Sequence, residues 1–232
     1  NISPMLATAG DILDLPEDEW SFEGKWDGFR IVAELTLGSM TLPTRSGNDY
    51  TEKFGAIGSL AEDLADHDAV IDGEVVVFDS NGISSFEKLQ NAARDDIRFI
   101  AFDLLHLDGT SLVRKKYSDR RRLLELLTTG LDSVLVPPLL TGSAADAIAE
   151  SRERGWEGVV AKRTDSIYQP GKRAHTWIKY KNWRTQEVVI GGWRRGQGRR
   201  SGGFGSLLMG IPDGDGLRYV GRVGTGFDDR AL

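Results

Sequence analysis

Short, mainly apolar runs recur along most of the chain, a pattern that predicts β-strands. The runs are rich in β-branched and aromatic residues, and Gly, Asp or Asn bounds them, as at strand ends. They comprise Ser21–Phe22 leading into Gly24–Trp26, Arg30–Leu37, Val70–Phe78, Arg98–Leu105, Gly158–Lys162 and Thr176–Tyr180. The greater part of the chain is therefore expected to be built around β-sheets.

Three stretches instead carry apolar residues at helical spacing. Lys53–Asp66 places five apolar side chains on one face: Phe54, Ile57, Leu60, Ala61 and Leu64. Ser118 is the expected N-cap of a helix that ends at Gly130, and Ser143 that of a helix that ends at Gly155. Because strands and helices do not alternate regularly, an α+β arrangement is favoured over a doubly wound parallel sheet.

The pattern changes after Trp183. Three short apolar strands follow, Val188–Trp193, Ser206–Ile211 and Arg218–Val223, separated by glycine-rich turns. This predicts a second, all-β module, with a hinge at Asn182–Gln186 and a Gly- and Arg-rich loop over Arg194–Gly205. We therefore expect two domains, residues 1–185 and 186–232.

Composition excludes several classes of protein. The 232 residues are 40% hydrophobic and 28% charged, as in a globular protein of one or two domains. No apolar run approaches 18 residues, which excludes a transmembrane helix, and Asn1-Ile2-Ser3-Pro4 does not resemble a secretory signal. The absence of cysteine excludes a disulfide scaffold, a thiolate metal site and a cysteine nucleophile, and it fits the cytoplasm. Three scattered histidines disfavour a histidine zinc site or a catalytic triad.

Charge is distributed unevenly along the chain. Residues 151–232 hold 16 basic and 8 acidic residues, whereas residues 1–150 hold 13 and 27. Between Lys172 and Arg200 there are nine basic residues and one acidic residue, Glu187. This asymmetry indicates a basic surface that could bind nucleic acid. The alternative is an ordinary solvated face or a basic loop without a specific ligand.

A lysine lies between two carboxylates in Glu23-Gly24-Lys25-Trp26-Asp27-Gly28. If Glu23–Trp26 ends a strand, Glu23, Lys25 and Asp27 point to the same side. A lysine beside carboxylates is often an exposed ion pair. The alternative is a nucleophile, which attacks as a neutral amine favoured by desolvation and by neighbouring cations.

Other strands carry polar or aromatic groups that admit two interpretations. Asp72 and Glu74 share one face of an apolar strand, either in a surface hairpin or as ligands of a ribose or a metal ion. Phe102 is either a core residue or a platform on which a base stacks. Lys179 and Lys181 lie two residues apart and repel each other, so they either bind a phosphate between them or protect an edge strand.

Taken in order, six motifs resemble those of the covalent nucleotidyltransferases, which include ATP- and NAD-dependent DNA ligases, RNA ligases and mRNA capping enzymes. The motifs are Lys25-Trp26-Asp27-Gly28 with Arg30, Arg45-Ser46-Gly47, Asp72-Gly73-Glu74, Phe102-Asp103, Glu157-Gly158-Val159-Val160-Ala161-Lys162 and Lys179-Tyr180-Lys181. Four further stretches are similar to the ligase domain of bacterial ligase D, the multifunctional ligase of non-homologous end joining: Pro4–Thr8, Gly24–Gly28, Trp156–Lys162 and Gln186–Trp193.

This resemblance implies a nucleotidyltransferase (ATP-grasp-like adenylation) domain with antiparallel sheets and flanking helices, followed by an OB-fold. An OB-fold has about five strands, and the tail supplies three clear ones. The last motif of the family, a basic segment in the distal OB-fold, is not found before Leu232. We therefore expect the OB-fold to be incomplete in this chain.

The resemblance also implies a role for each motif residue. Lys25 attacks the α-phosphate of ATP and becomes lysyl-AMP. Nucleotide contacts are implied for Glu23, Arg30, Arg45, Glu74, Phe102, Val160, Lys179 and Lys181. Ligands of Mg²⁺ or Mn²⁺ are implied at Asp27, Glu157 and Glu74. The charge pattern adds Arg194, Arg195, Arg199 and Arg200 as residues expected to bind DNA.

The expected substrate is nicked or broken double-stranded DNA, sealed through a DNA-adenylate. Candidate partners are a Ku-type end-binding protein and fused polymerase or phosphoesterase domains, and we expect a monomer in the bacterial cytoplasm, associated with the nucleoid. A capping-type guanylyltransferase shares the lysine motif but uses GTP. An NAD-dependent ligase is disfavoured, because 24 residues before Lys25 leave no room for a nicotinamide-recognition domain. A nucleotide- or DNA-binding module without turnover is a further alternative.

Overall fold

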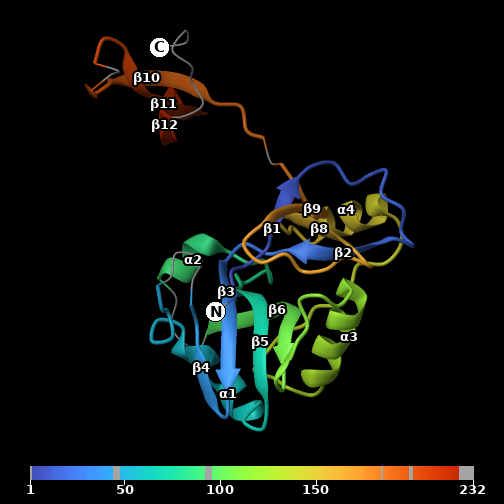
Figure 1. The fold of residues 1–232 in the computed structure, drawn as a ribbon. Helices are drawn as coiled ribbons and strands as arrows, with labels where there is room; N and C mark the ends of the chain where they lie inside the picture. Colours follow the sequence, from blue (N-terminus) through green and yellow to red (C-terminus); the bar gives the residue numbers. More distant parts are fainter. Residues whose placement is uncertain (1, 44–47, 92–95, 184, 199–200, 225–232) are drawn as a thin grey trace. The chain divides into compact units, whose positions relative to one another are not determined.

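The computed structural model describes residues 2–43, 48–91, 96–183, 185–198 and 201–224. It divides into two compact units, Asn1–Asn182 and Trp183–Leu232 (Figure 1). The first unit contains two β-sheets with the helices packed on them, and the second contains one small sheet. Among the described residues, no helix has the length and apolar character needed to cross a membrane.

The larger sheet of the first unit has five antiparallel strands in the order β4-β3-β5-β6-β7. The strands span Phe29–Thr36 (β3), Ser39–Thr41 (β4), Asp68–Val77 (β5), Ile97–Leu107 (β6) and Thr110–Ser111 (β7). Three of the predicted strands therefore form the centre of this sheet. The two short edge strands, β4 and β7, were not predicted, because runs of two or three residues carry no detectable alternation.

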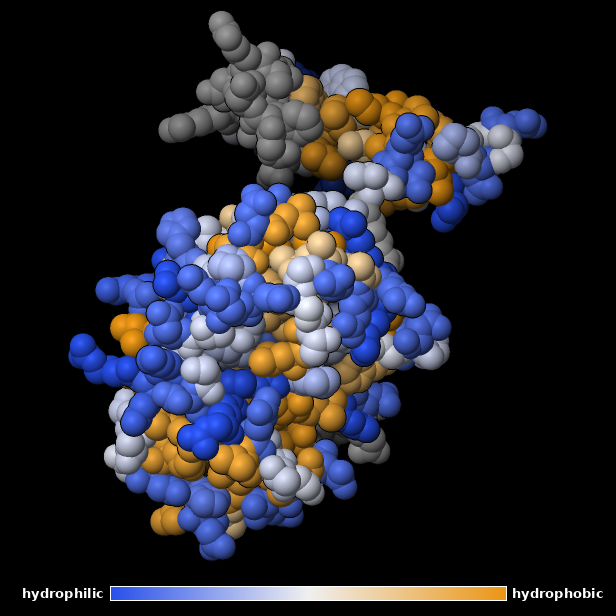
Figure 2. Space-filling view, turned by 90° about the vertical axis from the view of Figure 1, so that its right-hand side faces the viewer, coloured by the Kyte–Doolittle hydropathy of each residue, from blue (hydrophilic) through white to orange (hydrophobic). Residues whose placement is uncertain are grey.

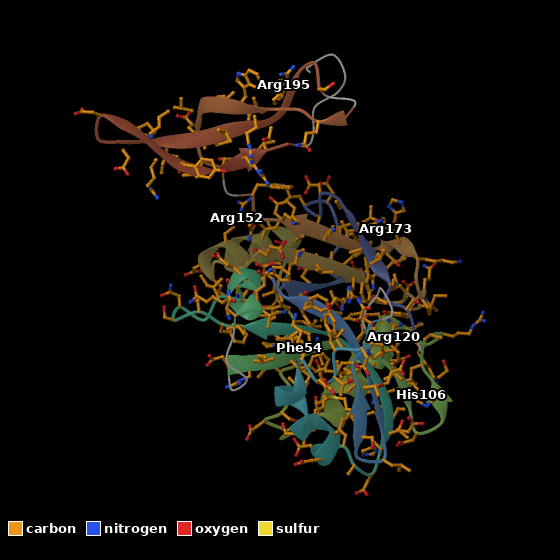
Figure 3. All side chains as sticks on the ribbon, turned by 90° about the vertical axis from the view of Figure 1, so that its left-hand side faces the viewer. Phe54, His106, Arg120, Arg152, Arg173 and Arg195 are labelled. Atoms are coloured by element: carbon orange, nitrogen blue, oxygen red, sulfur yellow. The ribbon has the colours of Figure 1, made fainter. Side chains whose placement is uncertain are left out.

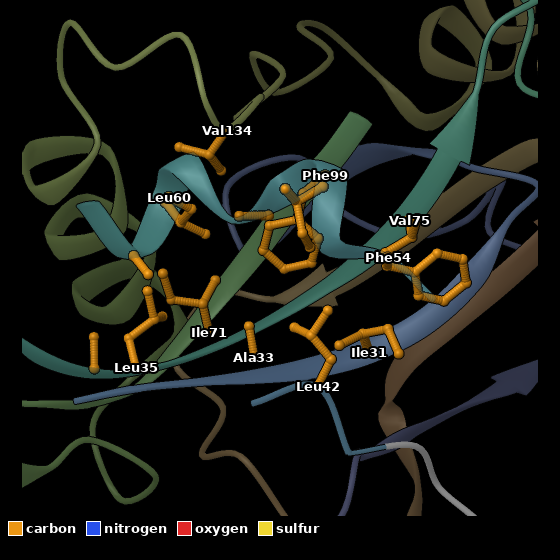
Figure 4. Packing of buried hydrophobic residues seen from close by; sticks show 14 of the residues in the cluster. Ile31, Ala33, Leu35, Leu42, Phe54, Leu60, Ile71, Val75, Phe99 and Val134 are labelled. Atoms are coloured by element: carbon orange, nitrogen blue, oxygen red, sulfur yellow. The ribbon is translucent and has the colours of Figure 1, made fainter. Parts of the chain in front are cut away.

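One face of this sheet is covered by the segment that was predicted to be a single helix. Ile31, Ala33 and Leu35 of β3 alternate toward the same core as Ile71 of β5 and Phe99 of β6 (Figure 4). Phe54, Ile57, Leu60, Ala61 and Leu64 pack against them, as their spacing predicted. The backbone, however, forms a 3₁₀-helix, Gly55–Ile57, and a short α1, Ser59–Asp63. Gly55 and Gly58 explain the correction, because glycine is the weakest helix former after proline.

The second sheet has four strands in the order β1-β9-β8-β2: β1 (Leu6–Ala9), β2 (Trp20–Lys25), β8 (Gly158–Arg163) and β9 (Arg173–Lys181). The β2–β8 and β8–β9 pairs are antiparallel, as expected. β1 was not predicted, and it pairs with β9 in parallel. Helix α4 (Ala144–Glu153) covers this sheet through Ala144, Ala147 and Ile148.

The remaining helices begin close to the predicted positions. Ser143 caps α4 in a reciprocal capping box with Asp146, as predicted. Helix α3 spans Tyr117–Leu127 with Lys116 at the N-cap, so the prediction of Ser118 as N-cap was wrong. The helix begins earlier because the buried Tyr117 donates its backbone N–H to Ser166. A short helix, α2 (Phe86–Gln90), was not predicted.

The second unit contains an antiparallel sheet of three strands in the order β10-β11-β12, which span Val189–Arg195, Phe204–Asp213 and Gly216–Val223. The described part of this unit forms no closed barrel. Arg194 and Arg195 lie in β10, so the predicted loop starts two residues too early. Apolar surface is visible on this unit (Figure 2). Val189, Trp193 and Leu217 of its sheet have exposed side chains.

Candidate active site

A cavity of about 260 Å³ lies between the two sheets of the first unit. Seven of the residues predicted to form the site line it: Glu23, Lys25, Arg30, Glu74, Phe102, Val160 and Lys179. Its other walls are Leu6, Ala7, Gly24, Trp26, Lys162, Arg173 and Trp177. The cavity thus brings together residues that are up to 156 positions apart in the sequence, from Glu23 to Lys179.

The register of the second sheet explains why these side chains meet. Glu23 of β2 is paired with Val160 of β8, which is paired with Lys179 of β9. Residues that lie opposite each other in neighbouring strands project from the same face of a sheet. This row of three therefore forms one wall of the cavity, and Lys25 extends it by two positions along β2.

Lys25 is bound to the residue that precedes β8. Its Nζ donates to Oε2 of Glu157, and Lys181 Nζ lies 2.9 Å from Oε1 of the same carboxylate. Burial by itself raises the pKa of Glu157, but the hydrogen bonds from Lys25 and Lys181 outweigh it and hold the pKa below its ordinary value. Glu157 and Lys181 do not line the cavity, yet they fix the lysine that does.

Positive charge is concentrated around Lys25. Lys179 has its pKa lowered by burial and by repulsion from Lys25, Arg173 and Lys181. Arg173 belongs to β9 (Figure 3), and its guanidinium donates to the backbone carbonyl of Ala7. Cations that repel one another at a cavity wall make a site where an anion such as phosphate is favoured.

Phe102 enters the cavity from the other sheet. Asp72 and Gly73 of β5 are paired with Asp103 and Ala101 of β6, so Phe102 between them is the extra residue of a β-bulge. Bulges redirect side chains and recur beside active sites. Phe102 and Val160 thus reach one cavity from different sheets, which is an arrangement that suits a flat ring.

Arg30 and Glu74 are cross-strand neighbours on β3 and β5. The Arg30 guanidinium binds Asp72 through two hydrogen bonds of 2.8 and 2.7 Å and lies over the Phe102 ring. Tyr168 donates to the same Asp72 carboxylate at 2.6 Å. Burial raises the pKa of Glu74 to about 7, despite the opposing positive charges of Arg30 and Lys25. Glu74 is therefore a carboxyl group poised to change its protonation near neutral pH.

Glu23 is buried in a network that the sequence did not suggest. Its Oε1 accepts from the Tyr117 hydroxyl and lies 2.8 Å from Lys162 Nζ and 3.8 Å from the Arg121 guanidinium. Lys162 also donates to the carbonyl of Phe102 and lies 4.3 Å from the centroid of the Trp177 ring. Burial lowers the pKa of Lys162, although the nearby carboxylates oppose that shift.

Of the three predicted metal ligands, Glu74 lines the cavity and Glu157 contacts Lys25, whereas Asp27 does not line the cavity. Its carboxylate accepts from the backbone N–H of Phe86, at the start of α2. It lies beyond the end of β2, so the predicted alternation with Glu23 and Lys25 does not extend to it. Within the described residues, no three acidic or histidine side chains are grouped as a metal site.

Three of the predicted residues, Arg45, Arg199 and Arg200, lie outside the described residues. Arg194 and Arg195 line a groove of about 480 Å³ in the second unit, together with Arg222. Arg173, Trp177 and Lys162 were not predicted as site residues. A signal existed for two of them, because Trp177 alternates with Lys179 along β9 and Lys162 ends the glycine-valine strand that Glu157 precedes.

Comparisons with known proteins show which family the chain resembles. The model of the ATP dependent DNA ligase domain matches residues 4–181, and that of the ATP dependent DNA ligase C terminal region matches residues 200–232. The multifunctional non-homologous end joining DNA repair protein LigD of Mycobacterium tuberculosis is 55% identical over 233 residues, and that of Pseudomonas aeruginosa is 35% identical over 240. These matches cover 100% of this chain but only 31% and 28% of the relatives.

Solved structures match over the whole chain. The ligase domain of M. tuberculosis LigD shares 54% identity with a TM-score of 0.76, and 75% of it is covered. A mycobacterial DNA ligase D complexed with ATP and MES shares 53% identity with a TM-score of 0.78, over 99% of this chain and 74% of that one. The fold is accordingly of the nucleotidyltransferase and OB type seen in the ligase domain of LigD. From its cavity, its motifs and these matches, the chain belongs to the family of ATP-dependent DNA ligase domains.

Proposed function

We propose that this chain carries out the adenylation chemistry of a DNA ligase and that Lys25 is its nucleophile. The observation that carries the proposal is the position of Lys25 in the wall of a cavity that also contains a ring platform and a group of cations. A nucleoside triphosphate needs both features, one for its base and one for its phosphates. The chain spans about a third of the length of the curated relatives that it matches, so the activity of the whole protein is part of this proposal.

In the first step, Lys25 Nζ attacks the α-phosphorus of ATP, a P–N bond forms, and the bond to the bridging oxygen breaks to release pyrophosphate. The amine attacks in its neutral form. Glu157 Oε2 accepts a hydrogen bond from Lys25 Nζ and orients it, and the proton lost by the amine passes to solvent, because the low pKa of Glu157 makes it a poor base. Lys179 and Lys181 would hold the α-phosphate and Arg45 a further phosphate, which supplies the electrostatic stabilisation on which phosphoryl transfer depends.

The rest of the nucleotide would occupy the cavity between the sheets. Adenine would stack on Phe102, with Val160 on its other face. Glu23 would contact the edge of the base, and Arg30 and Glu74 would hold the ribose. This assignment is supported by the joint presence of these five residues in the lining of one cavity.

Glu74 and Glu157 would hold a Mg²⁺ or Mn²⁺ ion, and the carboxylates present fit such an ion. Burial raises the pKa of Glu74, and the negative charge of Glu157 adds to the rise, so a cation shared by the two would relieve their repulsion. Mg²⁺ is commonly held by one or two carboxylates together with phosphate oxygens. The ion would neutralise charge on the phosphates. Asp27 is a less suitable ligand while it accepts from Phe86.

The later steps act on DNA. AMP would pass from Lys25 to the 5′-phosphate at a nick, and the 3′-hydroxyl would then attack the DNA-adenylate and expel AMP. Residues 1–185 would form the adenylation domain and residues 186–232 the first part of an OB-fold. Arg194, Arg195, Arg199 and Arg200 would contact the phosphates of the duplex. The similarity to LigD proteins of non-homologous end joining supports a role in break repair. We further propose, from the family resemblance of the motifs, that the protein acts as a monomer in the bacterial cytoplasm at the nucleoid. Its proposed partners are a Ku-type protein and fused polymerase or phosphoesterase domains.

The test is transfer of label from α-labelled nucleotide to protein in the presence of Mg²⁺ or Mn²⁺. Wild-type protein should become labelled with ATP and not with GTP. Lys25→Ala should lose the label entirely, yet still seal a pre-adenylated nick, because that step does not use the lysine as a nucleophile. Lys88→Ala, which changes an exposed lysine of α2, is the matched control and should label as wild type does.

Other results would decide against the proposal. Labelling with GTP alone would support a capping-type guanylyltransferase. An adduct mapped to a lysine other than Lys25 would reassign the nucleophile. Absence of label with every nucleotide would favour a binding module without turnover.

A further inference from the structure

The first turn of helix α3 reaches Glu23 from behind the cavity wall. Tyr117, which is fully buried, donates its hydroxyl hydrogen to Glu23 Oε1. Arg121 lies one helical turn later, on the same face of α3, and its guanidinium is 3.8 Å from the same oxygen. Lys162 Nζ approaches Oε1 from β8 at 2.8 Å. One hydroxyl donor and two cationic groups, from two elements, therefore converge on one carboxylate oxygen.

The second oxygen of the Glu23 carboxylate, Oε2, is not contacted by these three groups. None of the hydrogen bonds or ion pairs of the described residues involves Glu23 Oε2, and Glu23 lines the cavity. A carboxylate offers about four acceptor positions on its two oxygens. Anchoring through Oε1 thus leaves Oε2 to accept an N–H from a ligand.

Helix α3, which carries Tyr117 and Arg121, is held in place by an ion pair of its own. Arg120, between Tyr117 and Arg121, makes two hydrogen bonds of 2.7 and 2.8 Å to the buried carboxylate of Asp103 in β6. Any shift of α3 would separate this ion pair, and an unpaired buried charge is costly. Figure 3 places Arg120 inside the body of the first unit. Burial, followed by the charge of Glu23, raises the pKa of Tyr117, so its hydroxyl stays protonated as a donor.

We propose that Tyr117 is a positioning residue that sets purine selectivity, by orienting Glu23 so that Oε2 accepts a hydrogen bond from the 6-amino group of adenine. The inference rests on the proposed function, which puts adenine in this cavity. Guanine carries an oxygen at the same ring position. An acceptor facing an acceptor leaves both groups unpaired, and that is how a polar site rejects the wrong ligand.

The test compares two nucleotides that differ only in the 6-amino group, ATP and purine riboside 5′-triphosphate. For Tyr117→Phe, kcat/KM for adenylation of Lys25 should fall about tenfold with ATP, the size expected when a hydrogen bond to a charged group is lost. With the analogue it should change less than about twofold, because no amino group is present to be misplaced. Tyr50→Phe is the matched control, since Tyr50 packs on Phe29 and Phe54 and does not line the cavity.

A merely structural role for Tyr117 predicts something different. Equal losses with both nucleotides, or no loss with ATP, would overturn the inference. Glu23→Gln gives a second, independent measurement: adding Tyr117→Phe to it should not further change the ratio of ATP to analogue, because both substitutions act through one contact. Additive effects on that ratio would also overturn it. Failure of the wild type to form any adenylate would instead count against the proposed function.

Discussion

The carboxyl group of Glu74 is destabilised in its ionised form by burial in the cavity. Burial raises the pKa of its carboxyl group from 4.5 to about 7, even though Arg30 and Lys25 stabilise the ionised form. In the unfolded chain the group ionises near its ordinary value. The folded protein therefore binds this proton more tightly. The stability that comes from the bound proton is full at low pH and is lost as the pH rises from about 4.5 through 7.

Glu74→Gln should remove this dependence. The amide does not titrate, so the free energy of unfolding of the wild type should fall relative to that of the variant as pH increases. Between pH 4.5 and pH 8 the difference should grow by on the order of 3 kcal/mol, from about 1.4 kcal/mol per unit of pKa shift. Urea unfolding at several pH values, without nucleotide or metal, measures it. Glu87→Gln, at an exposed position of α2, supplies the baseline for the substitution. Curves for wild type and Glu74→Gln that stay parallel would contradict the prediction.

Individual residues differ in how far the sequence predicted them. Lys25, Phe102 and Lys179 line the cavity, and they could be named from the sequence because each lies in a short motif of neighbouring residues. The contact of Tyr117 with Glu23 joins residues 94 positions apart. No local pattern marks such a contact, since Tyr117 is spaced like any core residue of a helix.

At the scale of elements, the bulge that carries Phe102 depends on how closely β5 and β6 approach. Gly73 of β5 faces this bulge, and a Cβ atom there would lie 2.4 Å from the carbonyl oxygen of Ile100 and 2.5 Å from the ring of Phe99. Both are parts of the packed core and cannot move aside cheaply. Gly73 is therefore needed for strand pairing at the site.

Gly73→Ala should destabilise the protein by about 1–3 kcal/mol, as overpacking does, and it should also reduce adenylation because Phe102 is displaced. Gly55→Ala is the matched control. A Cβ atom at Gly55 meets no atom within 4 Å, so this variant should be neutral or stabilised by up to about 1 kcal/mol. Thermal unfolding and nucleotide labelling of both variants test the pair. Equal stability of the two would show that β5 and β6 can separate at little cost.

The long strands were predictable because each buries one face over many residues, as β3 does with Ile31, Ala33 and Leu35. Elements that depend on distant partners were not. β1 exists through its pairing with β9, more than 160 residues later. α2 begins where Ser85 caps it and Asp27 accepts from Phe86. In both cases tertiary contacts, rather than periodicity, determine the structure.

In the whole molecule, the uneven charge along the sequence corresponds in part to the division into two units. The acidic first 150 residues contribute to the unit that contains the cavity. In the second unit, Arg194, Arg195 and Arg222 line one groove, whereas Arg218 lies 3.4 Å from Asp213. A duplex carries a dense row of phosphates, so arginines gathered at one groove suit it better than arginines paired with carboxylates.

Replacing Arg194, Arg195, Arg199 and Arg200 by Gln should therefore weaken binding to nicked duplexes of any sequence, since phosphate contacts carry no base information. If all four contact phosphates, the slope of log affinity against log salt should flatten by about 3.6, at about 0.9 for each lost contact. Lysyl-AMP formation should be nearly unchanged, because the α-phosphate of ATP is assigned to Lys179 and Lys181 and not to these four arginines. Arg218→Gln, which removes an arginine beside Asp213, is the control and should alter the slope little. Nicked-DNA affinity measured at several salt concentrations decides the matter. An unchanged slope in the quadruple variant, or an equal loss of adenylation, would mean that these arginines do not follow the DNA backbone.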